Sequence, residues 1–295
     1  MQSPSHSRCP RRRADCPKAD RCQREFCPRP NILYVVGVGP GNPDYLSKRS
    51  LSVLNRVKTI AGFTPCIDLI RPLLKGKHIV STDVEKNGAI VMEAAVEIAF
   101  NEGSCAVVSA GDPEIYAMTA LAFEMCRERQ IPIVPAHAPK NPNGLPDNTL
   151  LIEVVPGIPD ICCGAALLGA PLSHDFVSIN LNDPTTPWKI IEQRIEATAR
   201  ADFVIVIANP TKKGRNTERL EQTRKILLKY RAQGTPVGIV SHIASTGQSV
   251  TIVPLAQLHT VEVDMPATVF VGNSATSTYM DCMITPRVVL EKTPP

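Results

Sequence analysis

Short apolar runs that end in glycine or proline recur along the chain from residue 31 onward. In the first half they cover residues 32–36, 105–109, 131–134 and 150–155. Amphipathic segments follow two of them, one opened by Pro43 and Asp44 and one with Met118, Leu121, Ala122 and Met125 on a single helical face. Buried parallel strands read as continuous apolar runs, so this alternation predicts an α/β fold with a parallel sheet.

The second half repeats this alternation from about Pro171 onward. Strand-like runs cover residues 176–181, 203–208, 237–240 and 267–271, and helical segments lie near 187–200 and 217–231. The sequence thus predicts two α/β domains, 31–171 and 172–290. Residues 138–148 form a Pro/Asn-rich loop, which predicts a lid or a disordered insert. Residues 1–30 are polar and lack periodicity, which predicts a tail outside the fold.

Charge is concentrated in that tail. Eight basic and three acidic residues lie in 1–30, so the other 24 basic and 25 acidic residues leave the body at −1, although the chain carries +4. A near-neutral body with 4% aromatic residues argues against a nucleic-acid surface. No apolar run approaches the roughly 18 residues of a membrane helix, and the first 30 residues lack a secretory apolar region. We therefore expect a cytoplasmic protein that binds neither membrane nor nucleic acid.

The chain has ten cysteines. Cys9, Cys16, Cys22 and Cys27 lie in the tail, with six, five and four intervening residues. These spacings match no common zinc or iron–sulfur pattern, although four thiolates suffice for a metal or an iron–sulfur cluster. A disordered basic tail with free thiols is the alternative. The other six are expected to be small buried hydrophobic residues, Cys66, Cys105, Cys126, Cys162, Cys163 and Cys282.

Three glycine turns follow predicted strands. They are Gly37-Val38-Gly39-Pro40-Gly41, Gly111-Asp112-Pro113 and Pro156-Gly157. Each has a steric interpretation, because glycine permits tight turns, and Asp112-Pro113 also suits the start of a helix. Together they indicate a ligand site, since the carboxyl ends of parallel strands meet at one edge of a sheet. The first lacks the spacing of a dinucleotide fingerprint.

With Gly169-Ala170-Pro171-Leu172, these turns resemble, in order and separation, those of the tetrapyrrole (corrin/porphyrin) methylases. The resemblance runs from Asn31 to about Arg287. Further segments resemble the branch of this family that methylates C17 of precorrin-3B, namely 172–176, 186–188, 208–210, 263–265, 271–274 and 283–287.

The resemblance implies a mostly parallel N-terminal sheet domain and a mixed-sheet C-terminal domain, with S-adenosylmethionine in the cleft between them, in a homodimer. It implies methylation of C17 of precorrin-3B or cobalt-precorrin-3 with ring contraction, in cobalamin biosynthesis. Another precorrin position, a non-catalytic binding protein, and a ribose or protein methyltransferase are the alternatives. The residues that it assigns to the cofactor are Gly37, Gly39, Pro40, Gly41, Gly111, Asp112, Ile115, Tyr116, Pro156, Gly157, Ala208, Asn209, Pro266, Ala267 and Thr268.

The chain departs from the family pattern at several places. Glu114 stands where glycine is common, and Pro159 where serine or threonine is common. Ser241-His242 replaces an expected arginine, and residues 138–148 are an insert.

Methyl transfer from a sulfonium mainly needs alignment and exclusion of water, but ring contraction also needs proton handling. Asp112, His174 and Asp44 are the catalytic candidates, with Asp175 nearby. For His174 a hydrogen bond to backbone is an equal alternative, and Asp44 is also a simple helix-start carboxylate. Lys212, Lys213 and Arg215 are candidates to pair with the carboxylates of a tetrapyrrole, with solvated surface charge as the alternative.

Overall fold

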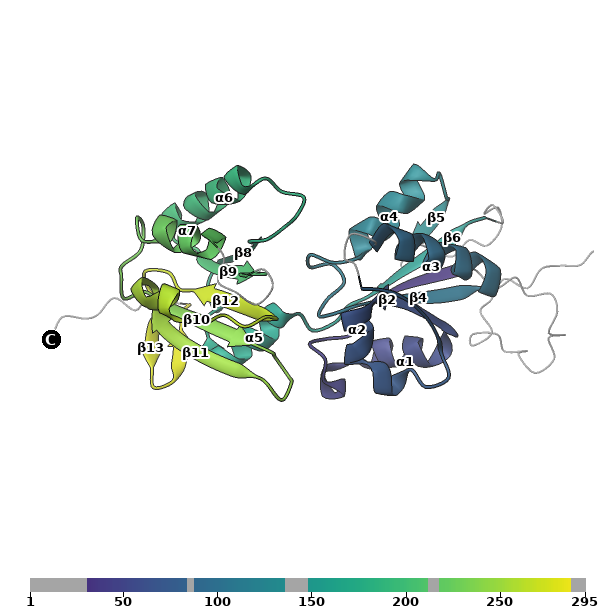
Figure 1. Cartoon of the computed structure of the whole chain (residues 1–295), viewed down its shortest axis with the longest axis horizontal. Helices are drawn as coiled ribbons and strands as arrows, with labels where there is room; N and C mark the ends of the chain where they lie inside the picture. The colour runs from purple at the N-terminus through teal and green to yellow at the C-terminus, as the bar shows by residue number, and fades with distance from the viewer. Residues whose placement is uncertain (1–30, 84–87, 136–147, 212–217, 288–295) are drawn as a thin grey trace, which may run out of the picture. The chain divides into compact units, whose positions relative to one another are not determined.

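The computed structural model describes residues 31–83, 88–135, 148–211 and 218–287 (Figure 1). The chain forms two compact units. Among the described residues, one unit holds 31–38 together with those within 47–157, and the other holds Gly39–Leu46 together with those within 158–287. The main boundary between the two units therefore falls after Gly157, whereas the sequence predicted a domain boundary between residues 171 and 172. The reason is helix α5 (Asp160–Leu168), which packs on the sheet of the second unit.

The first unit contains one six-stranded sheet in the order β3-β2-β4-β1-β6-β5, and every pair in it is parallel. Its strands are β1 (Asn31–Gly37), β2 (Thr59–Phe63), β3 (His78–Thr82), β4 (Ser104–Ser109), β5 (Ile133–Pro135) and β6 (Leu150–Val155). Its helices are α1 (Lys48–Arg56), α2 (Thr64–Leu69), α3 (Gly88–Glu102) and α4 (Thr119–Glu128), with a 3-10 turn at Arg71–Leu73.

Helices cover both faces of this sheet. Helices α3 and α4 lie on one side, and α1 and α2 lie on the other (Figure 1). Met92 and Ala95 of α3 pack with Val35 of β1 and Val107 of β4 in one buried cluster. Because both faces are covered, the central strands consist almost wholly of buried apolar residues.

The second unit contains a mixed sheet in the order β11-β10-β12-β9-β8, in which only β8 and β9 are parallel. Its strands are β8 (Phe176–Asn180), β9 (Val204–Ala208), β10 (Pro236–Ser241), β11 (Ser249–Pro254) and β12 (Ala267–Val271). A small sheet joins β7 (Gly169–Ala170), β13 (Ser277–Tyr279) and β14 (Cys282–Ile284). The remaining elements are α6 (Trp188–Arg200), α7 (Glu218–Leu227) and 3-10 turns at Pro43–Tyr45 and Leu255–Thr260.

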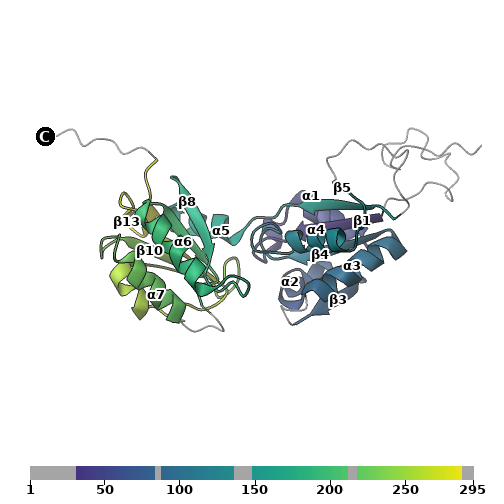
Figure 2. The same ribbon diagram turned by 90° about the horizontal axis from the view of Figure 1, so that it is seen from above.

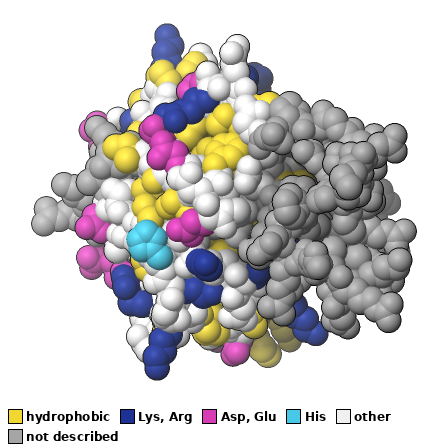
Figure 3. All heavy atoms as spheres, turned by 90° about the vertical axis from the view of Figure 1, so that its right-hand side faces the viewer, with side chains coloured by type: hydrophobic (Ala, Val, Ile, Leu, Met, Phe, Trp, Pro, Cys, Tyr) yellow, Lys and Arg dark blue, Asp and Glu magenta, His cyan; other side chains and the backbone are white. Residues whose placement is uncertain are grey.

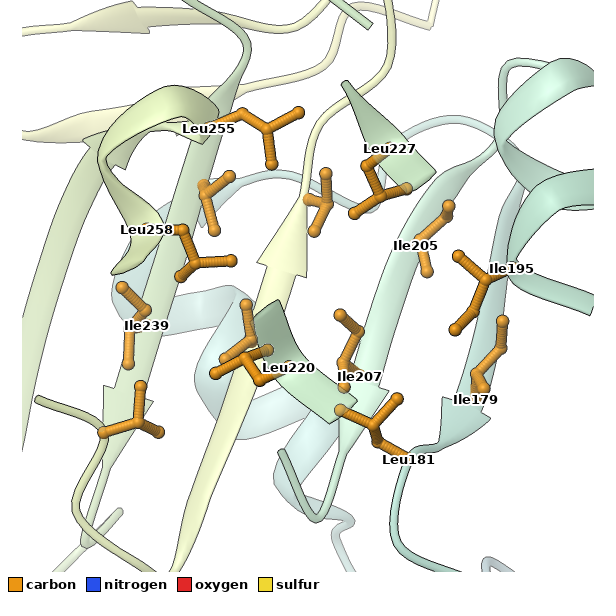
Figure 4. Packing of buried hydrophobic residues seen from close by; sticks show 14 of the residues in the cluster. Ile179, Leu181, Ile195, Ile205, Ile207, Leu220, Leu227, Ile239, Leu255 and Leu258 are labelled. Carbon is orange, nitrogen blue, oxygen red and sulfur yellow. The ribbon is translucent and has the colours of Figure 1, made fainter. Parts of the chain in front are cut away.

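Two cores lie on opposite faces of this mixed sheet. Helices α6 and α7 run side by side (Figure 2), and Ile195 and Leu220 from them pack against Ile207 and Ile239 of the sheet (Figure 4). On the other face, Leu168 of α5 packs with residues of the same sheet and with Met283. The predicted fold class, a parallel sheet followed by a mixed one, is confirmed.

Some elements differ from the prediction. The helix expected from Pro43 onward begins at Lys48, because the side chain of Ser47 caps it by accepting a hydrogen bond from Ser50 N. Strands β2 and β3 and helix α3 were not predicted. Among the six cysteines expected to be buried, Cys162 and Cys282 are exposed and Cys66 is half-buried. Cys162 adjoins the buried Cys163 on α5, and a helix turns adjacent residues to different sides.

None of the helices in the described ranges is both long and apolar enough to cross a membrane.

Candidate functional site

The carboxyl ends of β1, β4 and β6 meet at one rim of the first unit. Gly37 pairs with Ser109 and Val36 with Val155, so the three strands end at the same level. A Cβ atom on Gly37 would lie 2.6 Å from Gly157 N and 2.7 Å from Gly111 O. The three predicted turns therefore meet backbone to backbone, and Gly37 and Gly157 are glycines because no side chain fits between them.

Asp112 joins two of these turns. Its Oδ2 accepts a hydrogen bond from Gly157 N at 3.0 Å, and its Oδ1 accepts one from Glu114 N at 2.9 Å. The alternative that Asp112 starts the next helix is wrong, because α4 begins at Thr119. Asp112 instead holds the loop after β4 against the loop after β6, so both of its oxygens are already used within the protein.

The loop after Asp112 presents side chains to solvent. Ile115 and Tyr116 are 40% and 50% exposed. Tyr116 adopts a left-handed backbone with φ of 54°, a conformation that is uncommon for a bulky residue. Two predicted cofactor-binding side chains are thus partly exposed at this loop.

Two interactions that hold the strand ends in place were not predicted from the sequence. Ser50 of α1 is fully buried and donates from Oγ to Gly37 O at 2.9 Å. Arg49, its neighbour, forms an ion pair with Glu153 of β6, with Nε 2.7 Å from Oε1. Serine and arginine at the start of a helix beside a glycine turn were the available signal.

The start of α5 follows the Pro156-Gly157 turn. Asp160 occupies the first turn of the helix, after Pro159 at the N-cap. Burial raises the pKa of the Asp160 carboxyl. Cys163, one turn later, has its pKa raised to about 11, first by burial and then by the charge of Asp160.

Three cofactor candidates, Gly39, Pro40 and Gly41, belong with Asp44 to the short segment of the second unit. Gly39 has a left-handed φ of 71°, and a Cβ there would lie 3.1 Å from Tyr45 O. Asp44 is exposed in the 3-10 turn that follows, and its N donates to Asn42 Oδ1 at 2.9 Å.

His174 also belongs to the second unit, whereas Asp112 belongs to the first. Its Nδ1 accepts a hydrogen bond from Asp175 N at 2.8 Å, which corresponds to the backbone alternative. The Asp175 carboxylate is largely exposed and lies 3.9 Å from the same nitrogen. Catalytic roles for Asp112, His174 and Asp44 stay predictions.

The remaining cofactor candidates gather at one edge of the mixed sheet. Ala208 at the end of β9 pairs with Thr268 of β12, and Ser241 at the end of β10 pairs with Ala267. Asn209 continues from β9 with a left-handed φ of 48°. Pro266 precedes β12 and accepts a hydrogen bond through its carbonyl from His242 N at 2.8 Å. These residues, which the resemblance assigns to the adenosine part of the cofactor, therefore lie together at one edge of the sheet.

Two polar pairs border this group. Asn209 Nδ2 donates to Asn180 Oδ1 at 3.1 Å, and His242 Nε2 lies 2.8 Å from Asp264 Oδ2. Neither pair was predicted, although polar residues directly after apolar strands were the available signal. Ser241-His242 was noted only as a departure from the family pattern.

Two surface depressions bordered by described residues lie away from these turns. One, of about 510 Å³, is bordered by Thr59 and His78 where β2 and β3 begin, whereas the glycine turns follow strand ends. The other, of about 240 Å³, lies around Arg231 and Asn273. The side of the first unit shown in Figure 3 mixes basic and acidic groups.

Several predicted residues lie outside the described ranges. These are Lys212, Lys213 and Arg215, most of the 138–148 insert, and Cys9, Cys16, Cys22 and Cys27. The metal or cluster hypothesis for the tail stays a prediction. Among the described residues, no group of three or more His, Cys, Asp or Glu side chains is placed to hold a metal ion.

Known proteins resemble this chain over most of its length. The family model for Tetrapyrrole (Corrin/Porphyrin) Methylases matches residues 32–259. The cobalt-factor III methyltransferase of Priestia megaterium is 38% identical over 86% of the chain, which spans only 44% of that protein. The probable cobalt-factor III C(17)-methyltransferase of Salmonella typhimurium is 30% identical over 87% of the chain and 98% of its own length.

Solved structures share the fold. The methyltransferase CobJ superimposes with a TM-score of 0.73 at 30% identity, over 86% of this chain and 99% of its own. A uroporphyrin-III C-methyltransferase from Thermus thermophilus, complexed with S-adenosyl homocysteine, has a TM-score of 0.57 at 18% identity, over 81% and 91%. On the family match and these relatives, the chain belongs to the tetrapyrrole (corrin/porphyrin) methylases.

Proposed function

We propose that this chain is an S-adenosylmethionine-dependent methyltransferase that methylates C17 of precorrin-3B or its cobalt-containing counterpart, with ring contraction. The observation that carries the proposal is the rim where Gly37, Gly111 and Gly157 meet and Asp112 ties the loops together. The names of the relatives at 30% and 38% identity support the choice of substrate.

The residues present fit the donor. Its amino acid part carries an ammonium and a carboxylate, which main-chain carbonyl and N–H groups of a glycine-rich loop match. Gly111, Asp112, Ile115 and Tyr116 would hold this part. Pro266, Ala267 and Thr268, with Ala208 and Asn209, offer small side chains and main chain to the adenosine.

The donor supplies a methyl group already activated by its positive sulfur. Consequently, the protein mainly has to hold the accepting carbon in line with that group and exclude water. Rigid loops serve this task, because small displacements of the reacting atoms lower the rate strongly. Asp112 therefore acts in the proposal as a positioning residue, while exposed His174 is the candidate for proton transfer.

An oxygen-free assay tests the function. The purified chain is mixed with S-adenosylmethionine and either metal-free or cobalt-loaded trimethylated precursor, and the products are examined by mass spectrometry and visible absorption. One added methyl group with a changed chromophore is expected. The precursor that is methylated, metal-free or cobalt-loaded, shows whether the enzyme acts before or after cobalt is inserted. Donor binding without a mass change would refute C17 methylation and favour another precorrin position or a binding protein.

The proposal includes a homodimer in the cytoplasm, as the resemblance implies. Light scattering during gel filtration measures the mass in solution. A mass of one chain at assay concentrations would contradict the dimer.

A further inference from the structure

The edge of the mixed sheet that holds Ala208, Asn209 and Pro266–Thr268, called here the adenosine edge, carries different polar side chains on its two sides. Toward β9 and β8 lie the side-chain amides of Asn209 and Asn180, joined at 3.1 Å. Toward β10 lie the imidazole of His242 and the carboxylate of Asp264, joined at 2.8 Å. Pro266–Thr268, at the start of β12, lie between the two pairs in the sheet order.

His242 is held firmly by its backbone. Its N donates to Pro266 O at 2.8 Å, and its O accepts from Ser245 Oγ at 2.8 Å. Its φ of 51° is left-handed, so the chain turns directly after β10. A Cβ on Gly247 would lie 3.6 Å from the ring carbon Cγ, so the loop packs beside the imidazole.

Asp264 is the accessible member of the pair. Its side chain is 70% exposed, whereas that of His242 is 28% exposed. Its Oδ2 lies 2.8 Å from the imidazole, and Oδ1 accepts no hydrogen bond from the described part of the chain. One oxygen is thus anchored and the other is available to a ligand, two residues before Pro266.

Adenosine has two kinds of polar group. The base carries donors and acceptors, which side-chain amides match because they carry both. The ribose carries two adjacent hydroxyl donors, which a carboxylate matches because it only accepts, and acidic residues commonly bind ribose in nucleotide sites.

We infer that Asp264, oriented by His242, accepts hydrogen bonds from the ribose hydroxyls of the methyl donor. The inference rests on the proposed use of S-adenosylmethionine. Asp264 is the residue that contacts the ligand, and His242 is a positioning residue.

Titration calorimetry of the full chain with S-adenosylhomocysteine and its 2′-deoxy and 3′-deoxy analogues tests the inference. Wild type should bind at least one deoxy analogue about 10-fold more weakly, the effect of one hydrogen bond to an exposed charged group. Asp264→Ala should bind the parent compound about 10-fold more weakly and no longer discriminate. Asp281→Ala removes another exposed carboxylate of the same unit and should leave both values unchanged.

His242 is tested by rescue. His242→Gln keeps a side-chain N–H donor at similar reach and should retain discrimination between the parent and deoxy compounds, whereas His242→Ala should lose most of it. Equal melting temperatures show that both variants fold. Equal discrimination in both variants would refute the positioning role.

The outcomes separate this inference from the proposed function. If wild type methylates the precursor but does not discriminate against either deoxy analogue, or if Asp264→Ala binds like wild type, the ribose assignment is overturned alone. If binding and discrimination are found without methyl transfer, the ribose assignment is supported and the C17 function fails. If wild type binds no S-adenosylhomocysteine, both fail.

Discussion

Replacing Gly37 by alanine tests the backbone junction of the first unit. The new Cβ would lie 2.6 Å from Gly157 N and 2.7 Å from Gly111 O and Gly157 Cα. Carbon contacts are most favourable at about 3.5–4.0 Å, so the main chains must separate by roughly 1 Å. All three obstacles are backbone atoms in the turns that follow β4 and β6, which cannot rotate away as a side chain can.

The expected loss in the free energy of unfolding is about 3 kcal/mol, at the upper end for overpacking. For a unit of this size, that lowers the melting temperature by about 10 °C. Thermal unfolding followed by circular dichroism measures it. Gly88→Ala is the matched control, because its Cβ would meet only side-chain atoms at 3.5 Å or more and would favour α3. A Gly37→Ala melting temperature within 2 °C of wild type, on the order of 0.5 kcal/mol, would refute the reasoning.

Three other predictions concern side chains. Asp112→Ala should lower the affinity for S-adenosylhomocysteine about 10-fold in calorimetry, because Gly157 N and Glu114 N lose their acceptor, and Asp112→Asn should retain part of it; equal affinity of all three proteins would contradict this. Arg49→Met should destabilise the protein by about 2 kcal/mol in urea unfolding and Glu153→Gln by less, because only the first leaves a nearly buried charge without its partner; the reverse order would contradict it. Burial raises the pKa of Cys105 to about 12, so native protein at pH 8 should be alkylated at exposed Cys162 and Cys282 well before Cys105, which peptide mass mapping would measure. Early labelling of Cys105 would contradict its burial. The same raised pKa has a consequence for stability: because the folded-state pKa of Cys105 lies above its ordinary value of 9.0, its contribution to stability is present below pH 9 and is lost as pH rises toward 12.

The central strands were predictable because burial on both faces makes them apolar throughout. Leu33–Val36 and Cys105–Val108 are all buried, and such runs stand out in a sequence. Strand β3 (His78–Thr82) lies at the sheet edge, and its residues are half-buried or exposed. Helix α3 is apolar on most sides because it packs on the sheet and on α4, so it lacks a clear amphipathic period.

The candidate site was predictable where close backbone approach, as at Gly37 and Gly157, or a left-handed φ, as at Gly111, demands glycine. The turns at Gly37, Gly111 and Gly157 were found from the sequence, but their mutual contact was not, because it joins positions more than 40 residues apart. The hydrogen bond from Gly157 N to Asp112 and, in the second unit, the pair formed by His242 and Asp264 also join positions that are distant in the sequence. A single sequence shows residue types and local spacing, and it does not show which turns face each other.

The short segment Gly39–Leu46 belongs to the second unit although both of its neighbours belong to the first. The polypeptide therefore passes between the units three times, after Val38, after Leu46 and after Gly157. Truncation at residue 157 would remove this segment from the unit in which it packs, so neither half can be cloned as an intact piece by one cut. A protease nick at any one of the three passages would leave the two units covalently connected through the other two. Separate expression of either unit requires an engineered join, across residues 39–46 for the first unit and between Leu46 and Ile158 for the second.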